Sequence, residues 1–237
     1  MRPRLPAVFN ILVKRVCLLI LIMFLCAETF SEESVCYGTT ASGRLENGVL
    51  LPSKGNNFES YSSVARALGR SYVHSDVLKI IVAAYAALES SQPEKVFKYA
   101  ESGFKEGGKF KPHKTHQNGL SVDFMVPVVN KSGKSVHLPT NPLNKFGYKI
   151  EFDENSQYED YSIDYEAMTA HIVELDKATK SAGFTLWRVI FDPNLQPNLY
   201  STKYAEYLKA NIQFSTKPFW VRHDEHYHID FNIPCKK

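Results

Sequence analysis

The feature that most constrains the fold is the stretch from Trp220 to Phe231, which reads WVRHDEHYHIDF and is predicted to be the last strand. It carries three of the eight histidines, His223, His226 and His228. Because successive side chains of a strand point to opposite faces, His226 and His228 project from the same face. That face is expected to form half of a metal site. The remaining ligands must come from elsewhere in the chain.

The other half is predicted in the motif H-x-x-G-x-x-x-D, which runs from His116 to Asp123. His116 is expected on a loop, Gly119 allows a tight turn, and Asp123 lies in the strand that follows. Imidazole nitrogens and carboxylate oxygens are normal zinc donors, so His116, Asp123 and His228 predict a zinc site with one position open for water. An open position is typical of a catalytic zinc. His113 is a further ligand candidate.

A proton acceptor is also needed, and His226 is the first candidate because it shares the face of His228 and titrates in the useful range. His223 is the next, as a second base or as a donor to the developing oxyanion. Glu225 is a third, although strand alternation would turn it to the opposite face. The sequence contains no H-E-x-x-H motif, so the common helical metalloprotease arrangement is excluded.

The other three histidines of the sequence have simpler interpretations. His171 lies in a predicted helix and is expected to be a core or surface residue. His137 lies in a polar loop, and His74 lies near the start of a predicted helix.

Residues 1–27 have the layout of a signal peptide, with four basic residues before an apolar run from Val16 to Ala27. The run is shorter than the roughly 20 residues that span a bilayer, which disfavours an uncleaved anchor. Cleavage is expected after Ala27, with Ser31 as the alternative. The mature chain, residues 28–237, is then expected to be a single domain in the periplasm, without membrane attachment.

Removal of the leader takes away four of the 28 basic residues and none of the 25 acidic ones, which leaves 24 against 25. The mature chain therefore has no basic excess that would indicate binding to nucleic acid. Export also makes a disulfide between Cys36 and Cys235 the simple expectation, since the other two cysteines lie in the leader. The alternative, a pair of cysteine zinc ligands, is weaker because neither cysteine belongs to a C-x-x-C pair.

The rest of the pattern indicates an α+β fold. Helices are predicted from Ser75, as N-cap, to before Pro93, from an N-cap at Ser162 to Gly183, and over 204–212. Strands are predicted over 96–100, 119–129 (with Pro127 at an edge or an end), 148–152 and 184–191. Residues 36–57 and 130–145 have loop composition.

The segments GGKFKPHKTHQNGLSVDF and WVRHDEHYHIDF resemble the signatures of the penicillin-insensitive murein endopeptidases. This family is related to D-alanyl-D-alanine metallopeptidases, lysostaphin-type peptidases and the hedgehog domain. The similarity extends to YVHSDVL at Tyr72 and VIFDPNLQPNLY at Val189. The resemblance implies a small antiparallel sheet that carries the metal and is flanked by helices. It also implies zinc ligands at His116, Asp123 and His228, a further site histidine at His113, and active-site histidines at His226 and His223.

The expected function is therefore that of a zinc D,D-endopeptidase, which hydrolyses the D-alanyl to meso-diaminopimelyl cross-links of peptidoglycan. The alternatives are a D,D-carboxypeptidase of the same group and a catalytically silent, zinc-stabilised cell-wall binding module. Two departures from the family stand out. A second metal pair has no clear match around Phe146 to Phe152, so no second zinc is predicted. Asp230 stands where the family tends to be basic.

Overall fold

The computed structural model describes residues 33–217 and 221–237, which belong to one compact unit, Glu33–Lys237. The predicted signal peptide and Trp220 lie outside the described residues. Within the described ranges, no helix is long and apolar enough to cross a membrane.

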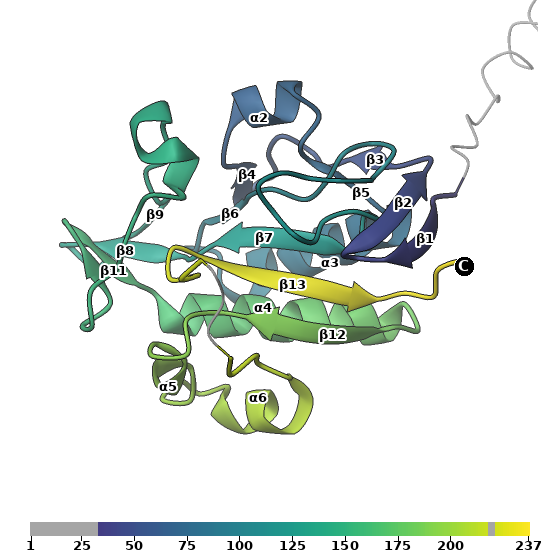
Figure 1. Ribbon diagram of the computed structural model, residues 1–237. Helices are drawn as coiled ribbons and strands as arrows, with labels where there is room; N and C mark the ends of the chain where they lie inside the picture. Colours follow the sequence, from purple (N-terminus) through teal and green to yellow (C-terminus); the bar gives the residue numbers. More distant parts are fainter. Residues whose placement is uncertain (1–32, 218–220) are drawn as a thin grey trace, which may run out of the picture. The chain divides into compact units, whose positions relative to one another are not determined.

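The central element is a five-stranded sheet of order β12-β13-β7-β6-β4 (Figure 1). Its strands are β12 (Thr185–Ile190), β13 (His226–Asn232), β7 (Ser121–Met125), β6 (Phe97–Tyr99) and β4 (Phe58–Ser60). All neighbours are antiparallel except β4 and β6, which pair in parallel. The mixture of this sheet with helices confirms the predicted α+β class.

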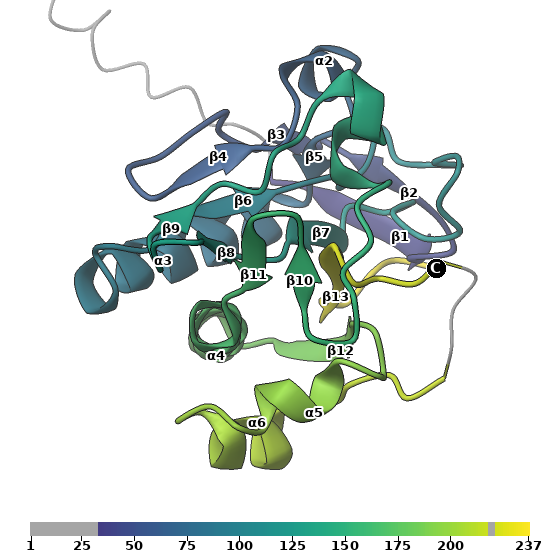
Figure 2. The same cartoon turned by 90° about the vertical axis from the view of Figure 1, so that its left-hand side faces the viewer.

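Two long helices, α3 (Ser75–Ser91) and α4 (Tyr165–Ser181), cover one face of this sheet (Figures 1 and 2). The ring of His171 in α4 is fully buried and stacks on Tyr85 of α3 and Phe97 of β6, with centroid distances of 4.9 and 5.3 Å. Tyr227 packs on the same side, so the alternation of β13 turns the neighbouring His226 and His228 to the other face. His171 is therefore a core residue, as expected.

The predicted N-caps of both helices are wrong by one or two residues. The Nδ1 atom of His74 accepts from the backbone N–H of Asp76 and caps α3, while Ser75 is the first helical residue. The carboxylate of Asp164 accepts from the N–H of Ala167 and caps α4 in place of Ser162. In each case the capping side chain stands immediately before the first helical residue, where it reaches the unpaired N–H groups of the first turn.

Residues 36–57 are not the predicted loop. They form a hairpin of β1 (Val35–Thr39) and β2 (Ser42–Glu46), followed by β3 (Val49–Leu50), which pairs with β5 (Tyr72–Val73). Gly38 adopts φ 65°, and a Cβ on Gly43 would lie 2.4 Å from the carbonyl oxygen of Tyr37. The glycines that indicated a loop therefore permit a close hairpin turn.

A second sheet extends from the region after β7. Its order is β10-β11-β8-β9, formed by β10 (Gln157–Tyr158), β11 (Tyr161–Ile163), β8 (Val128–Asn130) and β9 (Ser135–Val136). Pro127 separates β7 from β8, which agrees with its predicted place at a strand end. The predicted loop over 130–145 thus contains β9 and the start of the 3-10 helix η1 (Pro142–Gly147).

The predicted strand over 148–152 does not form. Ile150 and Phe152 are both fully buried in the core, and the N–H of Phe152 donates to the carboxylate of Asp224 at 2.5 Å. The apolar residues of this segment are buried by loop packing, not by pairing with a neighbouring strand.

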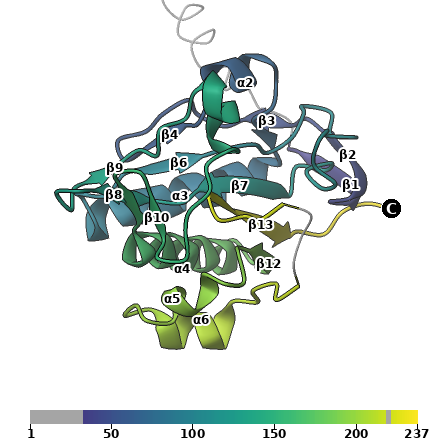
Figure 3. The same cartoon turned by 60° about the vertical axis from the view of Figure 1, so that its left-hand side comes forward.

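The remaining helices are α2 (Ser63–Ala67), α5 (Gln196–Leu199) and α6 (Ala205–Asn211). The last of these confirms the helix predicted over 204–212. Figure 3 shows α5 and α6 grouped beside α4, whereas α2 lies on the far side of the sheet from them.

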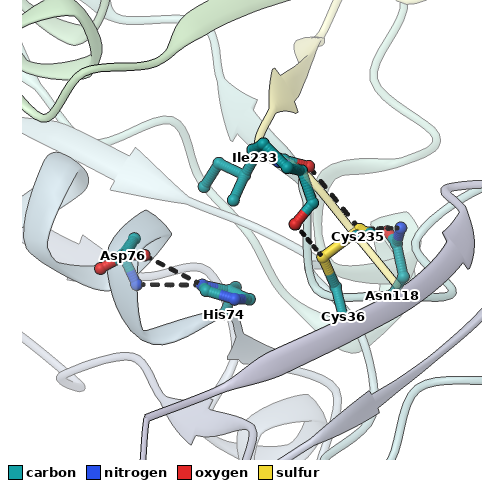
Figure 4. Close-up of a disulfide and its surroundings, with 7 residues drawn as sticks. Cys36, His74, Asp76, Asn118, Ile233 and Cys235 are labelled. Atoms are coloured by element: carbon teal, nitrogen blue, oxygen red, sulfur yellow. Dashed lines mark hydrogen bonds and ion pairs between the residues drawn. A yellow bond between two sulfur atoms is a disulfide. The ribbon is translucent and has the colours of Figure 1, made fainter.

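The predicted disulfide joins Cys36 of β1 to Cys235, which follows β13 (Figure 4). The N–H of Lys236 also donates to the carbonyl oxygen of Cys36 at 2.9 Å. The segment that follows β13 is therefore linked covalently to the hairpin of β1 and β2.

Candidate active site

Asp123 lies at the centre of the site. It is fully buried on β7, directly opposite His228 of the neighbouring strand β13. The hydroxyl of Tyr148 donates to its Oδ2 atom at 3.0 Å. Burial alone would raise the pKa of this carboxyl group, but the nearby His116 and His226 hold it well below its ordinary value. Asp123 is therefore a carboxylate, which is the form that binds cations.

Four histidines approach the two oxygens of Asp123. The distances to Oδ1 are 3.2 Å from His116 Nε2 and 2.9 Å from His228 Nδ1, and the distances to Oδ2 are 3.8 Å from both His113 Nδ1 and His226 Nε2. These histidines come from a loop before β7 and from β13, which are adjacent only in the folded sheet. The arrangement brings together the two halves that the sequence predicted.

The other ring nitrogen of each histidine donates to an oxygen outside this centre. The pairs are His116 Nδ1 with the Ser102 carbonyl (3.0 Å), His113 Nε2 with Glu101 (2.6 Å), His226 Nδ1 with Glu225 (2.8 Å) and His228 Nε2 with Asp230 (2.9 Å). Such outer bonds fix which nitrogen carries the proton and how the ring is turned. Each ring is thus oriented with its second nitrogen toward Asp123.

His116 has the surroundings of a metal ligand. Its side chain is fully buried, and its Nε2 atom makes no hydrogen bond although it lies 3.2 Å from Asp123 Oδ1, because the proton of the neutral ring is on Nδ1, which donates to the Ser102 carbonyl. A buried polar atom without a partner is costly unless an ion or water satisfies it. Burial lowers the pKa of His116, which favours the neutral ring that metals bind.

His113, His116 and Asp123 each offer a ligand atom within 4.8 Å of the others, so this group could hold a metal ion. The donor set of imidazole and carboxylate suits zinc chemistry. The predicted ligand His228 is not part of that group, although its Nδ1 atom faces the same carboxylate. Burial would lower the pKa of His228, but Asp230 and Asp123 raise it to about 10. Which of these histidines binds the metal stays a prediction.

His223 reaches the site from a turn, because β13 begins only at His226 and not near Trp220 as predicted. Its backbone has φ 56°, its Nδ1 atom donates to the Val221 carbonyl at 2.7 Å, and its ring lies 4.7 Å from that of His226. Burial, and then the charge of His226, lowers the pKa of His223 to about 4.

The turn that carries His223 is held by Arg222. The guanidinium donates to Asp192 at 2.7 Å and to the Phe152 carbonyl at 2.7 Å. The first contact fixes the turn to the segment after β12, and the second fixes it to the loop that also carries Tyr148. These charge-assisted hydrogen bonds hold the turn in place immediately before β13 begins.

Glu225 does not face the cleft. It stands just before β13, is buried, and orients His226 through its carboxylate. Burial would lower the pKa of His226, but the charges of Glu225 and Asp123 raise it. Of the three candidates for proton transfer, His226 and His223 line the cleft, whereas Glu225 contacts the ring nitrogen of His226 that points away from Asp123.

The histidines open into a cleft of about 820 Å³. Its walls come from α2, η1 and β12, and include Leu68, Phe146, Tyr148, Arg188 and Ile190. The end of the predicted loop over 130–145 contributes to the cleft through Lys145.

Glu101 and Tyr148 are site residues that the sequence analysis missed. Arg70 donates to Glu101 at 2.9 Å, and although burial would raise the pKa of Glu101, the hydrogen bonds from Arg70 and His113 lower it to about 2. The chain contains 25 acidic residues and no spacing that singles out Glu101. Only the rule that site histidines donate to carboxylates could have suggested such a partner.

An α+β domain with clustered histidines beside a cleft and a buried carboxylate behind them is typical of the class of metal-centred hydrolases. The family model of penicillin-insensitive murein endopeptidases matches residues 36–237, and the chain belongs to this family. Comparison with curated proteins gave no match for this chain. Membership confirms the predicted family and supports a peptidase activity on peptidoglycan.

Proposed function

We propose that this chain is an exported, zinc-dependent D,D-endopeptidase, which cleaves the D-alanyl to meso-diaminopimelyl cross-links of peptidoglycan in the periplasm. The observation that carries the proposal is the set of four oriented histidines around Asp123, in which His116 Nε2 is buried without a hydrogen-bond partner. Membership in the murein endopeptidase family supports the choice of substrate.

In this proposal, His116, Asp123 and His228 hold the zinc ion, and His113 is the further ligand candidate. When bound, zinc supplies a Lewis acid that polarises the scissile carbonyl and favours deprotonation of the attacking water near neutral pH. The outer partners of these side chains keep the donor atoms turned toward the centre.

His226 is proposed to move the proton. Its Nδ1 atom donates to Glu225, so Nε2 is the atom that faces the centre and accepts a proton from the attacking water. Glu225 stabilises the resulting imidazolium, which then delivers the proton to the leaving amine. This pairing of a base with an orienting carboxylate explains why Glu225 is buried.

His223 is better suited to accept a hydrogen bond than to donate one to the oxyanion. Its Nδ1–H is donated to the Val221 carbonyl, and its pKa of about 4 keeps the ring neutral. Its Nε2 atom is then an acceptor, which supports the second-base interpretation of this residue.

The proposal is tested by digestion of purified cross-linked muropeptide dimers with the wild type, His226→Ala and the control His137→Ala, which changes a histidine near Glu59 outside the cleft lining. We expect His226→Ala to retain zinc and to lose about 10²–10⁴-fold in kcat, while the control stays active. A wild type that binds zinc and removes only terminal D-alanine would be a D,D-carboxypeptidase. A wild type that binds zinc and leaves both the cross-link and the terminal D-alanine bond intact would be a binding module.

A further inference from the structure

The side chain of Asp230 contacts His228 at the ring nitrogen that points away from Asp123. The Nε2 atom of His228 donates to Asp230 Oδ1 at 2.9 Å, and Asp230 is completely buried. The two residues stand two positions apart on β13, so their side chains share the face that carries the site.

Asp230 is itself held from both neighbouring strands. Ser121 lies opposite it on β7 and donates its hydroxyl to Oδ1 at 2.6 Å. Arg188 lies opposite it on β12 and donates Nε to Oδ2 at 2.6 Å. The register of three adjacent strands therefore places the three side chains in one row, with Asp230 at its centre.

Ser121, Arg188 and His228 together donate three hydrogen bonds to the buried carboxylate, two to Oδ1 and one to Oδ2. A buried carboxylate without partners would be strongly unfavourable, and Ser121 and Arg188 already donate one hydrogen bond to each of its two oxygens. The bond to His228 is additional, and it leaves Nδ1 as the ring nitrogen that faces the site.

We propose that Asp230 is a positioning residue, which fixes the ring orientation and tautomer of His228 so that Nδ1 is presented to a metal ion, and that Ser121 and Arg188 hold Asp230 in place. This inference rests on the proposed function, in which His228 is a ligand. A carboxylate that accepts a hydrogen bond from the outer nitrogen of a ligating histidine also makes the metal-facing nitrogen more basic.

The test is the zinc affinity of the mature chain, measured by competition with a chromophoric chelator. We expect Asp230→Asn to weaken zinc binding by about 10–100-fold, because the amide lacks the negative charge that orients the ring and makes it basic. We expect Ser121→Ala to weaken zinc binding less, since it removes one of the bonds to the same carboxylate.

The matched control is Asp176→Asn. Asp176 is also buried and also accepts from two donors, Lys180 at 2.7 Å and the hydroxyl of Tyr207 at 2.8 Å, but these lie on α4 and α6. We expect Asp176→Asn to lose about as much stability as Asp230→Asn and to keep the zinc affinity of the wild type. If Asp230→Asn loses stability like this control and keeps wild-type zinc affinity, Asp230 is only a structural partner of Arg188 and the inference is wrong.

A second measurement covers the case in which Asp230→Asn does not fold. In the double variant Arg188→Met and Asp230→Asn, both members of the ion pair are neutral, so no arginine is left unpaired. We expect this variant to show the same loss of zinc affinity. The ¹⁵N resonance of His228 Nε2 should also move away from its protonated, strongly hydrogen-bonded position. An unchanged resonance would overturn the inference.

The outcomes separate this inference from the proposed function. A wild type that binds zinc, has the Nε2–H signature of His228 and cleaves no dimer contradicts the endopeptidase proposal alone. A wild type that cleaves dimers while Asp230→Asn and the double variant keep full zinc affinity contradicts the positioning role alone.

Discussion

Asp123 and His228 lie directly opposite each other on β7 and β13, and Asp123 Oδ1 is 2.9 Å from His228 Nδ1. Residues 105 positions apart in the sequence are thus joined by one antiparallel pairing. The register fixes this contact more tightly than loop packing could, because a slip of one residue would turn His228 to the opposite face. The contact between Asp123 and His228 therefore depends on the register of this strand pair.

The unpaired Nε2 atom of His116 predicts that this residue is needed for metal binding. We expect His116→Ala to lose most of its zinc, whereas His74→Ala, which removes a helix cap, should keep it. The measurement is zinc content by mass spectrometry after extensive dialysis, together with circular dichroism to verify folding. Equal zinc content in folded His116→Ala and the wild type would rule out His116 as a ligand.

The bond between Glu225 and His226 predicts a shift in the pH dependence of cleavage. The carboxylate raises the pKa of His226, so Glu225→Gln should lower that pKa. A base is active when neutral, and the acidic limb of kcat/KM should therefore move to lower pH. We also expect roughly a 10- to 100-fold lower maximum, since the orienting charge is lost. A pH–rate profile with an unmoved acidic limb would assign that limb to another group.

His171 predicts a pH dependence of stability that is independent of the active site. Burial lowers its pKa to about 3, whereas the unfolded chain binds a proton near pH 6.5. The contribution of this neutral ring to the free energy of unfolding is fully present above pH 6.5 and falls as the pH drops toward 3, by up to about 1.4 kcal/mol per pH unit.

We therefore expect the free energy of unfolding of His171→Phe to fall less steeply between pH 6.5 and 4 than that of the wild type. Urea unfolding of the metal-free proteins at several pH values measures both slopes. Parallel slopes would mean that His171 is protonated in the folded protein.

The disulfide between Cys36 and Cys235 closes a loop with a sequence separation of 199. Replacing both cysteines by serine should lower the free energy of unfolding by about 2–5 kcal/mol, because the unfolded chain gains conformational freedom. Denaturant unfolding of the oxidised protein, the reduced protein and the double variant measures this change. Free thiols in the mature, non-reduced protein would show that the bond does not form.

Several elements could be predicted from local pattern alone. The helices that became α3 and α4 have apolar residues at helical spacing, and the strand predicted over 184–191 became β12 (Thr185–Ile190). The hairpin of β1 and β2 could not be predicted, because its glycines are equally typical of a loop. The strand predicted over 148–152 was wrong because apolar residues can be buried in a loop as well as in a strand.

For the candidate site, the sequence by itself determined which residues are candidates for the chemistry. The spacing of His116 and Asp123 and the alternation of His226 and His228 are local properties, so they are visible without a fold. Glu225 and Asp230 are also local, since they lie one and two positions from the histidines that they contact. The tertiary structure alone decided which segments converge: strand pairing places Asp123 opposite His228, 105 positions away, and the loop after η1 brings the hydroxyl of Tyr148 to Asp123. Contacts over such separations depend on how the chain packs, which no local pattern records.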